Sequence, residues 1–245
     1  RVFLEMIRFE HTVFALPFAY LGMFLAAKGW PTLAQFFWVT VAMAAARTAA
    51  MSFNRVIDRA LDARNPRTAN RPIQTGRIGA AAVAFAAVAS LVVLGFAAWQ
   101  LNSLVFMLWP GAVIFLVGYS YTKQFTWLCH FILGFTDGLA PVGAWAAITG
   151  SLLAPSDLPA WLLLLAVTVW IGGFDILYAL QDIDVDRRDG LHSIPSRFGI
   201  PTALLMARLC HVLTVILLAT VGLTTGLGWP YWIGVAIVAG LFIYE

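Results

Sequence analysis

Charged residues are scarce in this sequence. Only 11% of its 245 residues are charged, whereas 61% are hydrophobic. A soluble domain typically carries about a quarter charged residues, so this chain lacks the polar surface that a soluble domain needs on every side. Cysteine is scarce as well. Cys129 and Cys210 lie inside apolar runs without metal-ligand spacing around them, which argues against a cysteine-based metal site and predicts two small buried side chains.

Long apolar runs take the place of the missing charge. Several approach about 20 residues, the length that an α-helix rising 1.5 Å per residue needs to cross roughly 30 Å of hydrocarbon. The runs do not alternate with a period of two, which favours helices over a closed barrel. We therefore predict an all-α, multi-span transmembrane helical bundle. About eight helices are expected, near residues 10–28, 33–60, 80–100, 103–121, 128–148, 158–182, 201–224 and 229–244.

Positive charges are concentrated in alternate loops. With the N-terminus inside, the outer loops hold little more than Lys28. The inner segments hold Arg1, Arg8, Arg64, Arg67, Arg71, Arg77, Lys123, Arg187, Arg188 and Arg197. Cytoplasmic loops of membrane proteins carry an excess of Lys and Arg. We therefore predict a multi-pass protein of the cell (inner) membrane whose long polar loops, about 62–79 and 183–200, both face the cytoplasm.

The two polar loops also indicate an internal repeat. Each follows a helix that ends in spaced aspartates, and each closes with a short Arg/Gly segment, Gly76-Arg77-Ile78-Gly79 or Ser196-Arg197-Phe198-Gly199. Asp58 and Asp182 lie about four spans apart in the predicted order. We therefore expect two pseudo-repeated four-helix halves around a central cavity, in which the two aspartate motifs meet.

Spaced acids are the main chemical feature of the chain. Residues 54–62 place an amide and two carboxylates on one helical face: Asn54, Asp58 and Asp62. Residues 182–190 place three carboxylates on one face, while Asp184 points elsewhere: Asp182, Asp186 and Asp189. Carboxylates stacked one turn apart repel each other, and Mg2+ prefers carboxylate oxygens together with water and substrate phosphates. A solvated, salt-bridged face would explain either motif alone, but two motifs at matching depths favour a metal site.

Further blocks of sequence surround these motifs. Asn54-x-x-x-Asp58-x-x-x-Asp62 is followed by Asn65-Pro66-Arg67-Thr68-Ala69-Asn70-Arg71-Pro72, and the second motif reads Tyr178-Ala179-Leu180-Gln181-Asp182-x-x-x-Asp186 with Gly190. These two blocks resemble the paired signatures of the UbiA family of membrane prenyltransferases. Tyr119-Ser120-Tyr121-Thr122-Lys123 and Gly138-Leu139-Ala140-Pro141-x-Gly143 are similar to lesser family blocks. The resemblance covers nearly the whole chain and is closest to the branch that prenylates 4-hydroxybenzoate.

The resemblance implies a fold and a reaction. The family usually has nine helices, so residues 1–245 would form a single transmembrane prenyltransferase domain, with a ninth span expected after Glu245. A prenyl group would pass from a prenyl diphosphate to a small aromatic acceptor, such as 4-hydroxybenzoate or a hydroxynaphthoate, in ubiquinone or menaquinone biosynthesis. The active site would open to the cytoplasmic side. Membrane lipid is the remaining partner, and neither a nucleic acid nor a protein partner is implied.

The chemistry of the residues, taken with this resemblance, predicts roles for individual side chains. Two Mg2+ ions would be held by Asn54, Asp58, Asp62, Asp182 and Asp186. The diphosphate would be bound by Asn54, Arg67, Arg71, Lys123 and Tyr119, with plain inner-side charges as the alternative for Arg71 and Lys123. The catalytic set would be Asp58, Asp62, Asp182, Asp186 and Arg47.

Arg47 and Asp175 lie deeper than the motifs, each seven residues before one of them. An intramembrane arginine is costly and usually functional. Arg47 would bind the acceptor carboxylate, brace the metal-binding acids, or pair structurally with Asp137 or Asp175. Asp175 would bind the acceptor by positioning its hydroxyl, or would hydrogen-bond across the bundle. A functional or a structural role stays open for Asp175, Asp189 and His11.

Two other classes remain open from the residues. A transporter or ion pathway also uses intramembrane Asp and Arg, although here the acids crowd one face instead of tracing a path across. A CDP-alcohol phosphotransferase also combines clustered aspartates with magnesium, but its Asp-Gly-x-x-Ala-Arg core is not found. Within the resembled family, haem, chlorophyll and archaeal-lipid branches remain possible. Prenyl chain length and oligomeric state are not decided by the sequence.

Overall fold

The structure, a computed structural model, describes residues 2–7 and 9–244, without the side chains of residues 9–15. Every regular element in this range is helical, which confirms the all-α prediction. By its internal contacts the chain divides into two compact units. Unit 1 comprises Arg1–Tyr121 and Ala146–Gly150, and unit 2 comprises Thr122–Trp145 and Ser151–Glu245. His11, which the sequence left open, lies among the residues whose side chains are outside the described part.

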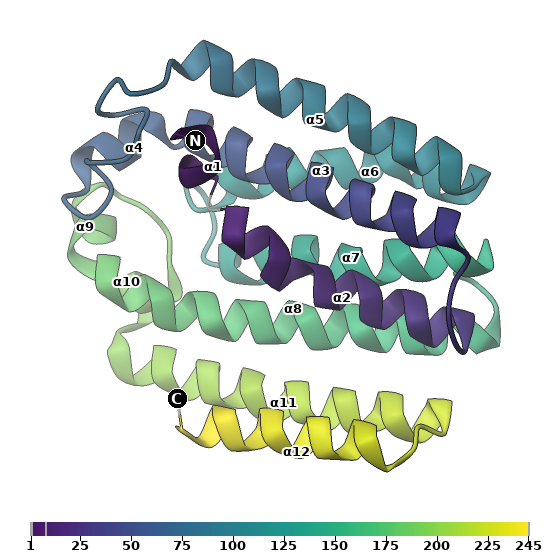
Figure 1. Cartoon of the computed structure of the whole chain (residues 1–245). Helices are drawn as coiled ribbons and strands as arrows, with labels where there is room; N and C mark the ends of the chain where they lie inside the picture. Colours follow the sequence, from purple (N-terminus) through teal and green to yellow (C-terminus); the bar gives the residue numbers. More distant parts are fainter. Residues whose placement is uncertain (1, 8, 245) are drawn as a thin grey trace. The chain divides into compact units, whose positions relative to one another are not determined.

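Unit 1 is built around the long helix that carries the first aspartate motif. Its helices are α1 (Val2–Met6), α2 (Phe9–Ala27), α3 (Leu33–Ile57), α4 (Arg59–Arg64), α5 (Ala80–Leu101) and α6 (Ser103–Thr122). A capping box starts α3: the Gln35 N–H donates to Thr32 Oγ1 at 3.2 Å, and the Thr32 N–H donates to Gln35 Oε1 at 3.0 Å. From this start α3 runs alongside α5 (Figure 1).

Small residues allow the helices of unit 1 to pack closely. Ala45 and Ala50 of α3 are buried together with Leu94 of α5 and Leu116 of α6. A Cβ added at Gly95 would lie 3.0 Å from the Trp109 ring. Within a bilayer, such small-residue contacts hold helices together because apolar burial by itself gives no advantage over lipid. This packing fixes the middle of α3, one turn before the aspartate motif.

The short helix α1 covers the polar loop between α4 and α5. Met6 and Ile7 are buried against Ile73 of that loop. The Arg77 guanidinium donates two hydrogen bonds of 2.9 Å to the Glu5 carboxylate, the bidentate geometry typical of Arg–carboxylate pairs. The loop is therefore held to α1 by an apolar contact and an ion pair.

Unit 2 contains the second aspartate motif. Its elements are α7 (Cys129–Thr149), η1 (Pro155–Asp157), α8 (Leu158–Ala179), η2 (Leu180–Asp182), α9 (Ile183–Arg188), α10 (Ile194–Phe198), α11 (Ile200–Thr225) and α12 (Trp229–Tyr244). In Figure 1, α11 runs beside α8, and α12 turns back along α11. A Cβ at Gly134 would overlap the Thr168 carbonyl of α8, and one at Gly173 would lie 2.8 Å from Cys210 Cβ. Glycine is therefore needed at both helix contacts.

The apolar helices match the predicted spans. Six regions of the described chain are long and apolar enough to cross a membrane: Leu33–Ile57, Ala80–Leu101, Ser103–Thr122, Cys129–Thr149, Pro155–Arg188 and Ile200–Thr225. Leu16–Ala27 and Trp229–Tyr244 are shorter apolar helices. Large apolar side chains stay exposed along these helices, for example Phe85 at 77% and Met107 at 71%. Such a surface is stable only under lipid, so the chain is an integral membrane protein. Cys129 and Cys210 are free and buried, as predicted.

The ends of two predicted helices need correction. The helix expected over 33–60 stops at Ile57, because Asp58 adopts φ −80° and ψ 3° and a separate helix follows. The helix expected over 158–182 stops at Ala179, where the backbone tightens into the 3-10 turn Leu180–Asp182. Helix ends often tighten in this way, and Asp side chains compete with the helical hydrogen bonds. Neither motif therefore lies on one continuous helix.

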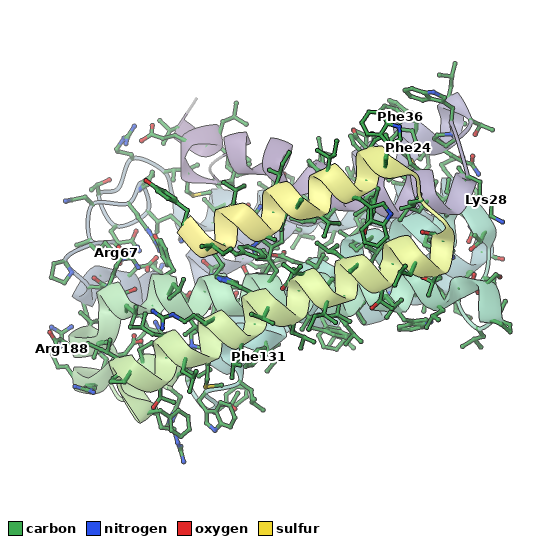
Figure 2. All side chains as sticks on the ribbon, turned by 90° about the horizontal axis from the view of Figure 1, so that it is seen from below. Phe24, Lys28, Phe36, Arg67, Phe131 and Arg188 are labelled. Carbon is green, nitrogen blue, oxygen red and sulfur yellow. The ribbon has the colours of Figure 1, made fainter. Side chains whose placement is uncertain are left out.

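The two units share an order of elements. In each, a long helix ends at an aspartate motif, a short helix follows, and the next long helix packs back on the first: α3–α4–α5 and α8–α9–α11. This order agrees with the predicted repeat, but the repeat and a shared central cavity both stay predictions. Within unit 1, Lys28 and Arg67 lie at opposite ends (Figure 2), as the predicted charge asymmetry requires.

Candidate active site

The first motif begins at the C-terminal end of α3. Asn54 Nδ2 donates to Asp58 Oδ2 at 2.7 Å and to Ser120 Oγ of α6 at 3.4 Å. Arg55 Nη1 donates to Asn54 Oδ1 at 3.2 Å. The Asp62 N–H donates to the Asp58 carbonyl at 2.7 Å, so one helical hydrogen bond bridges the break at Asp58. The predicted neighbours Asn54 and Asp58 are therefore in contact.

The carboxylate of Asp62 is buried and bound by the loop that follows it. Arg71 Nη1 lies 2.5 Å from Asp62 Oδ2, and Thr68 Oγ1 donates to the Asp62 carbonyl at 2.9 Å. Arg67 is exposed, and its backbone N–H donates to Asn65 Oδ1 at 2.9 Å. The structure thus brings Arg71 to the motif, although as a partner of the acid. Its predicted contact with diphosphate stays a prediction.

Arg47 and Tyr119 are two further predicted residues: Arg47 lies on α3, and Tyr119 of α6 contacts α3. The Tyr119 hydroxyl donates to the Ala50 carbonyl at 3.3 Å, between the levels of Arg47 and Asn54. Arg47 Nε is buried, and among the described residues it has no hydrogen-bond partner. Arg47 and Asn54 are two turns apart, or roughly 10 Å along the axis. Buried polar groups usually find a partner, so Arg47 stands out, and its predicted contact with the acceptor stays a prediction.

The most deeply buried carboxylate of the two aspartate motifs belongs to the second motif. Asp186 is 1% exposed, and its Oδ1 lies 2.8 Å from Lys123 Nζ. Its Oδ2 has no hydrogen-bond partner among the described residues. Burial lowers the pKa of Lys123, but the Asp186 carboxylate, with smaller contributions from Asp182 and Asp175, raises that pKa above its ordinary value. Lys123 is therefore fully charged at neutral pH.

The other acids of unit 2 differ in their surroundings. Asp182 is buried at 6% exposure, and Asp184 is exposed, as predicted. Asp189 pairs with its neighbour Arg188, whose Nε lies 2.9 Å from Asp189 Oδ1. This local pair shows that Asp189 is already bound by a cation from its own segment. Asp182 and Asp186 are the stronger candidates for a metal ligand.

Asp175 has a partner that sequence reasoning missed. His130 Nδ1 lies 2.6 Å from Asp175 Oδ2, and His130 Nε2 accepts the Ile194 N–H at 3.1 Å. This contact joins α7 and α8, which is one of the two roles considered for Asp175, and its role toward the acceptor stays a prediction. His130 is one of four histidines and carries no motif of its own. Its position at the start of the span expected over 128–148 was the available signal.

The donor set suits a magnesium site. Mg2+ takes carboxylate and amide oxygens and needs only one or two protein carboxylates beside a phosphate ligand. The unpartnered Asp186 Oδ2 and the Asn54–Asp58 pair supply such oxygens. Within the described residues of either unit, no three His, Cys, Asp or Glu side chains form a metal-binding group. The two motifs belong to different units, and their joint site stays a prediction.

Known proteins resemble the chain over most of its length. The model of the UbiA prenyltransferase family matches residues 15–245. The 4-hydroxybenzoate octaprenyltransferase of Methylobacillus flagellatus is 33% identical over 225 residues, which cover 91% of this chain and 74% of that protein. The enzyme of the same name from Cupriavidus necator is 35% identical over 227 residues, covering 91% and 77%.

Solved structures share the fold. The apo structure of a UbiA homolog from Aeropyrum pernix K1 has a TM-score of 0.90 at 33% identity, covering 96% of this chain and 86% of that one. A UbiA homolog from Archaeoglobus fulgidus bound to DMAPP and Mg2+ has a TM-score of 0.73 at 22% identity, covering 100% and 85%.

Proposed function

Since the chain belongs to the UbiA prenyltransferase family, we propose that it transfers a prenyl group from a prenyl diphosphate to 4-hydroxybenzoate or a related hydroxynaphthoate, in quinone biosynthesis. One observation carries the geometric part of the proposal. Each unit buries an aspartate of its motif in an ion pair with a cation of the same unit, Asp62 with Arg71 and Asp186 with Lys123. Because the chain belongs to this family, we set aside the transporter and the CDP-alcohol phosphotransferase as alternatives.

Metal binding is assigned to the two motifs. Asn54, Asp58, Asp62, Asp182 and Asp186 would hold Mg2+, and the diphosphate oxygens would complete its shell, with two ions as the working number. Bound there, the metal supplies positive charge that stabilises the diphosphate as it leaves. The support is the donor set: buried carboxylates, one of them with an unpartnered oxygen.

The cations beside the acids are assigned to the diphosphate. The Lys123 ammonium has three N–H donors, and the contact with Asp186 uses one. Lys123 can therefore keep Asp186 and donate to a phosphate oxygen. The Arg71 guanidinium has five donors and can likewise hold Asp62 and a phosphate together. Arg67, exposed on the same loop, and Tyr119 complete the proposed diphosphate set.

The chemistry is an electrophilic aromatic substitution. The allylic C–O bond breaks and its electron pair leaves with the diphosphate. A ring carbon of the acceptor forms the new C–C bond, and the ring then loses a proton. Arg47 would bind the acceptor carboxylate, because its buried Nε has no partner among the described residues and a guanidinium matches a carboxylate bidentately. Apolar helix surfaces would keep water from the allylic cation.

The proposed setting follows from the charges. The basic residues of the 62–79 and 183–200 loops would lie at the cytoplasmic face of the inner membrane, so the site would open to the cytoplasm. We further propose that residues 1–245 act as one prenyltransferase domain with the two units as halves around a common cavity.

The direct test uses purified protein in detergent. The protein is incubated with Mg2+, a prenyl diphosphate and a panel of aromatic acids, and products are identified by mass. Prenylated 4-hydroxybenzoate or hydroxynaphthoate is expected, and none with Asp186→Asn. Benzoic acid, which lacks the activating hydroxyl, is the matched negative acceptor. Absence of prenylated product from every hydroxylated acid would refute the proposal.

A further inference from the structure

His130 occupies a defined tautomer. The side chain is 2% exposed, and its Nε2 faces the Ile194 backbone N–H at 3.1 Å. A backbone N–H can only donate, so Nε2 must be the acceptor and the ring proton must sit on Nδ1. Nδ1 then donates to Asp175 Oδ2 at 2.6 Å. The two hydrogen bonds therefore fix the imidazole with its Nδ1–H directed at the Asp175 carboxylate.

His130 ties together three elements of unit 2. It lies on α7, Asp175 lies on α8, and Ile194 is the first residue of α10. Ile194 is fully buried, and the capping box of Ser193 and Ser196 fixes the start of α10. The imidazole thus sets the position of Asp175 relative to the segment that follows the second aspartate motif.

The second carboxylate oxygen of Asp175 has no hydrogen bond to the described residues. The side chain is 30% exposed, and within the described residues only His130 forms a hydrogen bond with its carboxylate. Asp175 stands seven residues before Asp182 on the approach to the motif, roughly 10 Å away at the helical rise. Its charge acts on Lys123, so it belongs to the same polar region of unit 2. A carboxylate oxygen at this position can accept a hydrogen bond from a hydroxyl group.

We propose that His130 is a positioning residue for the acceptor: it holds Asp175 through Oδ2 so that Oδ1 accepts the phenolic hydroxyl of the aromatic substrate. The inference rests on the proposed prenyl transfer to a hydroxylated aromatic acid. A phenol that donates to a carboxylate gains electron density in its ring, which favours attack by the ring carbon on the allylic centre. The role of His130 is to fix the rotamer of Asp175.

Two variants separate the two hydrogen bonds of the imidazole. The amide of His130→Asn can replace Nδ1–H toward Asp175 but cannot reach Ile194. The amide of His130→Gln can replace Nε2 toward Ile194 but offers no donor to Asp175. His192→Gln, at a histidine of the neighbouring segment, is the matched control. Steady-state KM and kcat are measured for both substrates in each variant.

The proposal expects a split between the substrates. His130→Gln should raise the acceptor KM or lower acceptor kcat/KM on the order of tenfold, the scale of losing a hydrogen bond to a charged group. Its KM for prenyl diphosphate should stay within about twofold, and His130→Asn should recover most of the loss. Equal losses in His130→Gln and His130→Asn, an unchanged acceptor KM, or a parallel change in both KM values would overturn it.

A binding measurement tests the same inference without relying on the activity of the His130 variants. Inhibition or binding constants of 4-hydroxybenzoate and 4-methylbenzoate are compared in the wild type and in Asp175→Asn. The wild type should prefer the hydroxylated acid on the order of tenfold, and Asp175→Asn should lose that preference. Equal preference in both proteins refutes the positioning role. Wild-type turnover separates failure of this inference from failure of the proposed function. Turnover without a preference for the hydroxylated acid refutes this inference alone. No turnover with any acid refutes the proposed function as well.

Discussion

The Lys123–Asp186 pair allows a sharp test of how the second motif is held. Asp186 is 1% exposed, and its Oδ1 lies 2.8 Å from Lys123 Nζ. At an effective dielectric constant of about 20, unit charges at this distance attract each other by roughly 6 kcal/mol. Removing one partner of a buried pair typically costs about 3–5 kcal/mol. The lysine side chain is 36% exposed, so solvent screening reduces the expected cost of Lys123→Met to about 2–3 kcal/mol.

The assay is thermal unfolding in detergent together with prenyl diphosphate affinity. Lys123→Met should lower Tm by roughly 5–10 °C, and Lys123→Met/Asp186→Asn should recover at least half of that loss because no buried charge remains. Lys28→Met, at an exposed lysine, is the control and should change Tm little. If Lys123→Met is as stable as the wild type, the lysine does not hold Asp186. Lost stability with unchanged prenyl diphosphate KM would remove Lys123 from the diphosphate set.

The pH dependence of this pair has a definite sign. The pKa of Lys123 is raised in the folded protein above its ordinary value of 10.5. A raised pKa means that the pair contributes fully below the unfolded value and is lost as pH rises through the folded one. The stability difference between wild type and Lys123→Met should therefore be constant from about pH 6 to 9. A difference that shrinks within this range contradicts the assignment.

The remaining predictions concern the metal, the acceptor and the packing. Chelation should abolish turnover, and added Mg2+ should restore it. The variants Asp58→Ala and Asp182→Ala should fold but stay inactive. Full turnover in excess chelator would refute the metal role. Arg47→Ala should raise the acceptor KM by a factor that corresponds to about 2 kcal/mol, with little change in the prenyl diphosphate KM. Arg47→Lys should restore part of the acceptor affinity. Equal effects on both substrates would mean that Arg47 braces the metal-binding acids. Asp157 accepts hydrogen bonds from Trp145 Nε1, Ser151 Oγ and the Ala154 N–H at 2.7–2.9 Å, so Asp157→Ala should destabilise unit 2 by about 3 kcal/mol in thermal unfolding.

The helices were predictable because their signals are local. Apolar runs and turn residues such as Pro31 and Gly228 placed most ends within a few residues. The break at Asp58 was not predictable in this way, since the i, i+4 spacing of Asn54, Asp58 and Asp62 fits an unbroken helix equally well. What ends α3 there is a backbone conformation that the spacing does not encode.

The site was predictable only in part. Spacing and charge identified the buried acids Asp62 and Asp186, because carboxylates repeated on helices have few structural uses. Their cations could not be assigned: Arg71 lies nine residues after Asp62 in a loop, and Lys123 lies on a different element from Asp186. His130 escaped notice because its partner Asp175 is 45 residues away and no spacing rule connects them.

The ion pair between α1 and the polar loop, Glu5–Arg77, has a consequence for the order of folding. Glu5 and Arg77 are 72 residues apart, and α2, α3 and α4 all lie between them. A contact across so long a stretch of chain carries a large loop-closure cost and forms only once the intervening segments have been synthesised and placed. The Glu5–Arg77 ion pair is therefore expected to form only after α2, α3 and α4 are in place, so α1 closes over a loop whose local contacts with Asp62 can already exist.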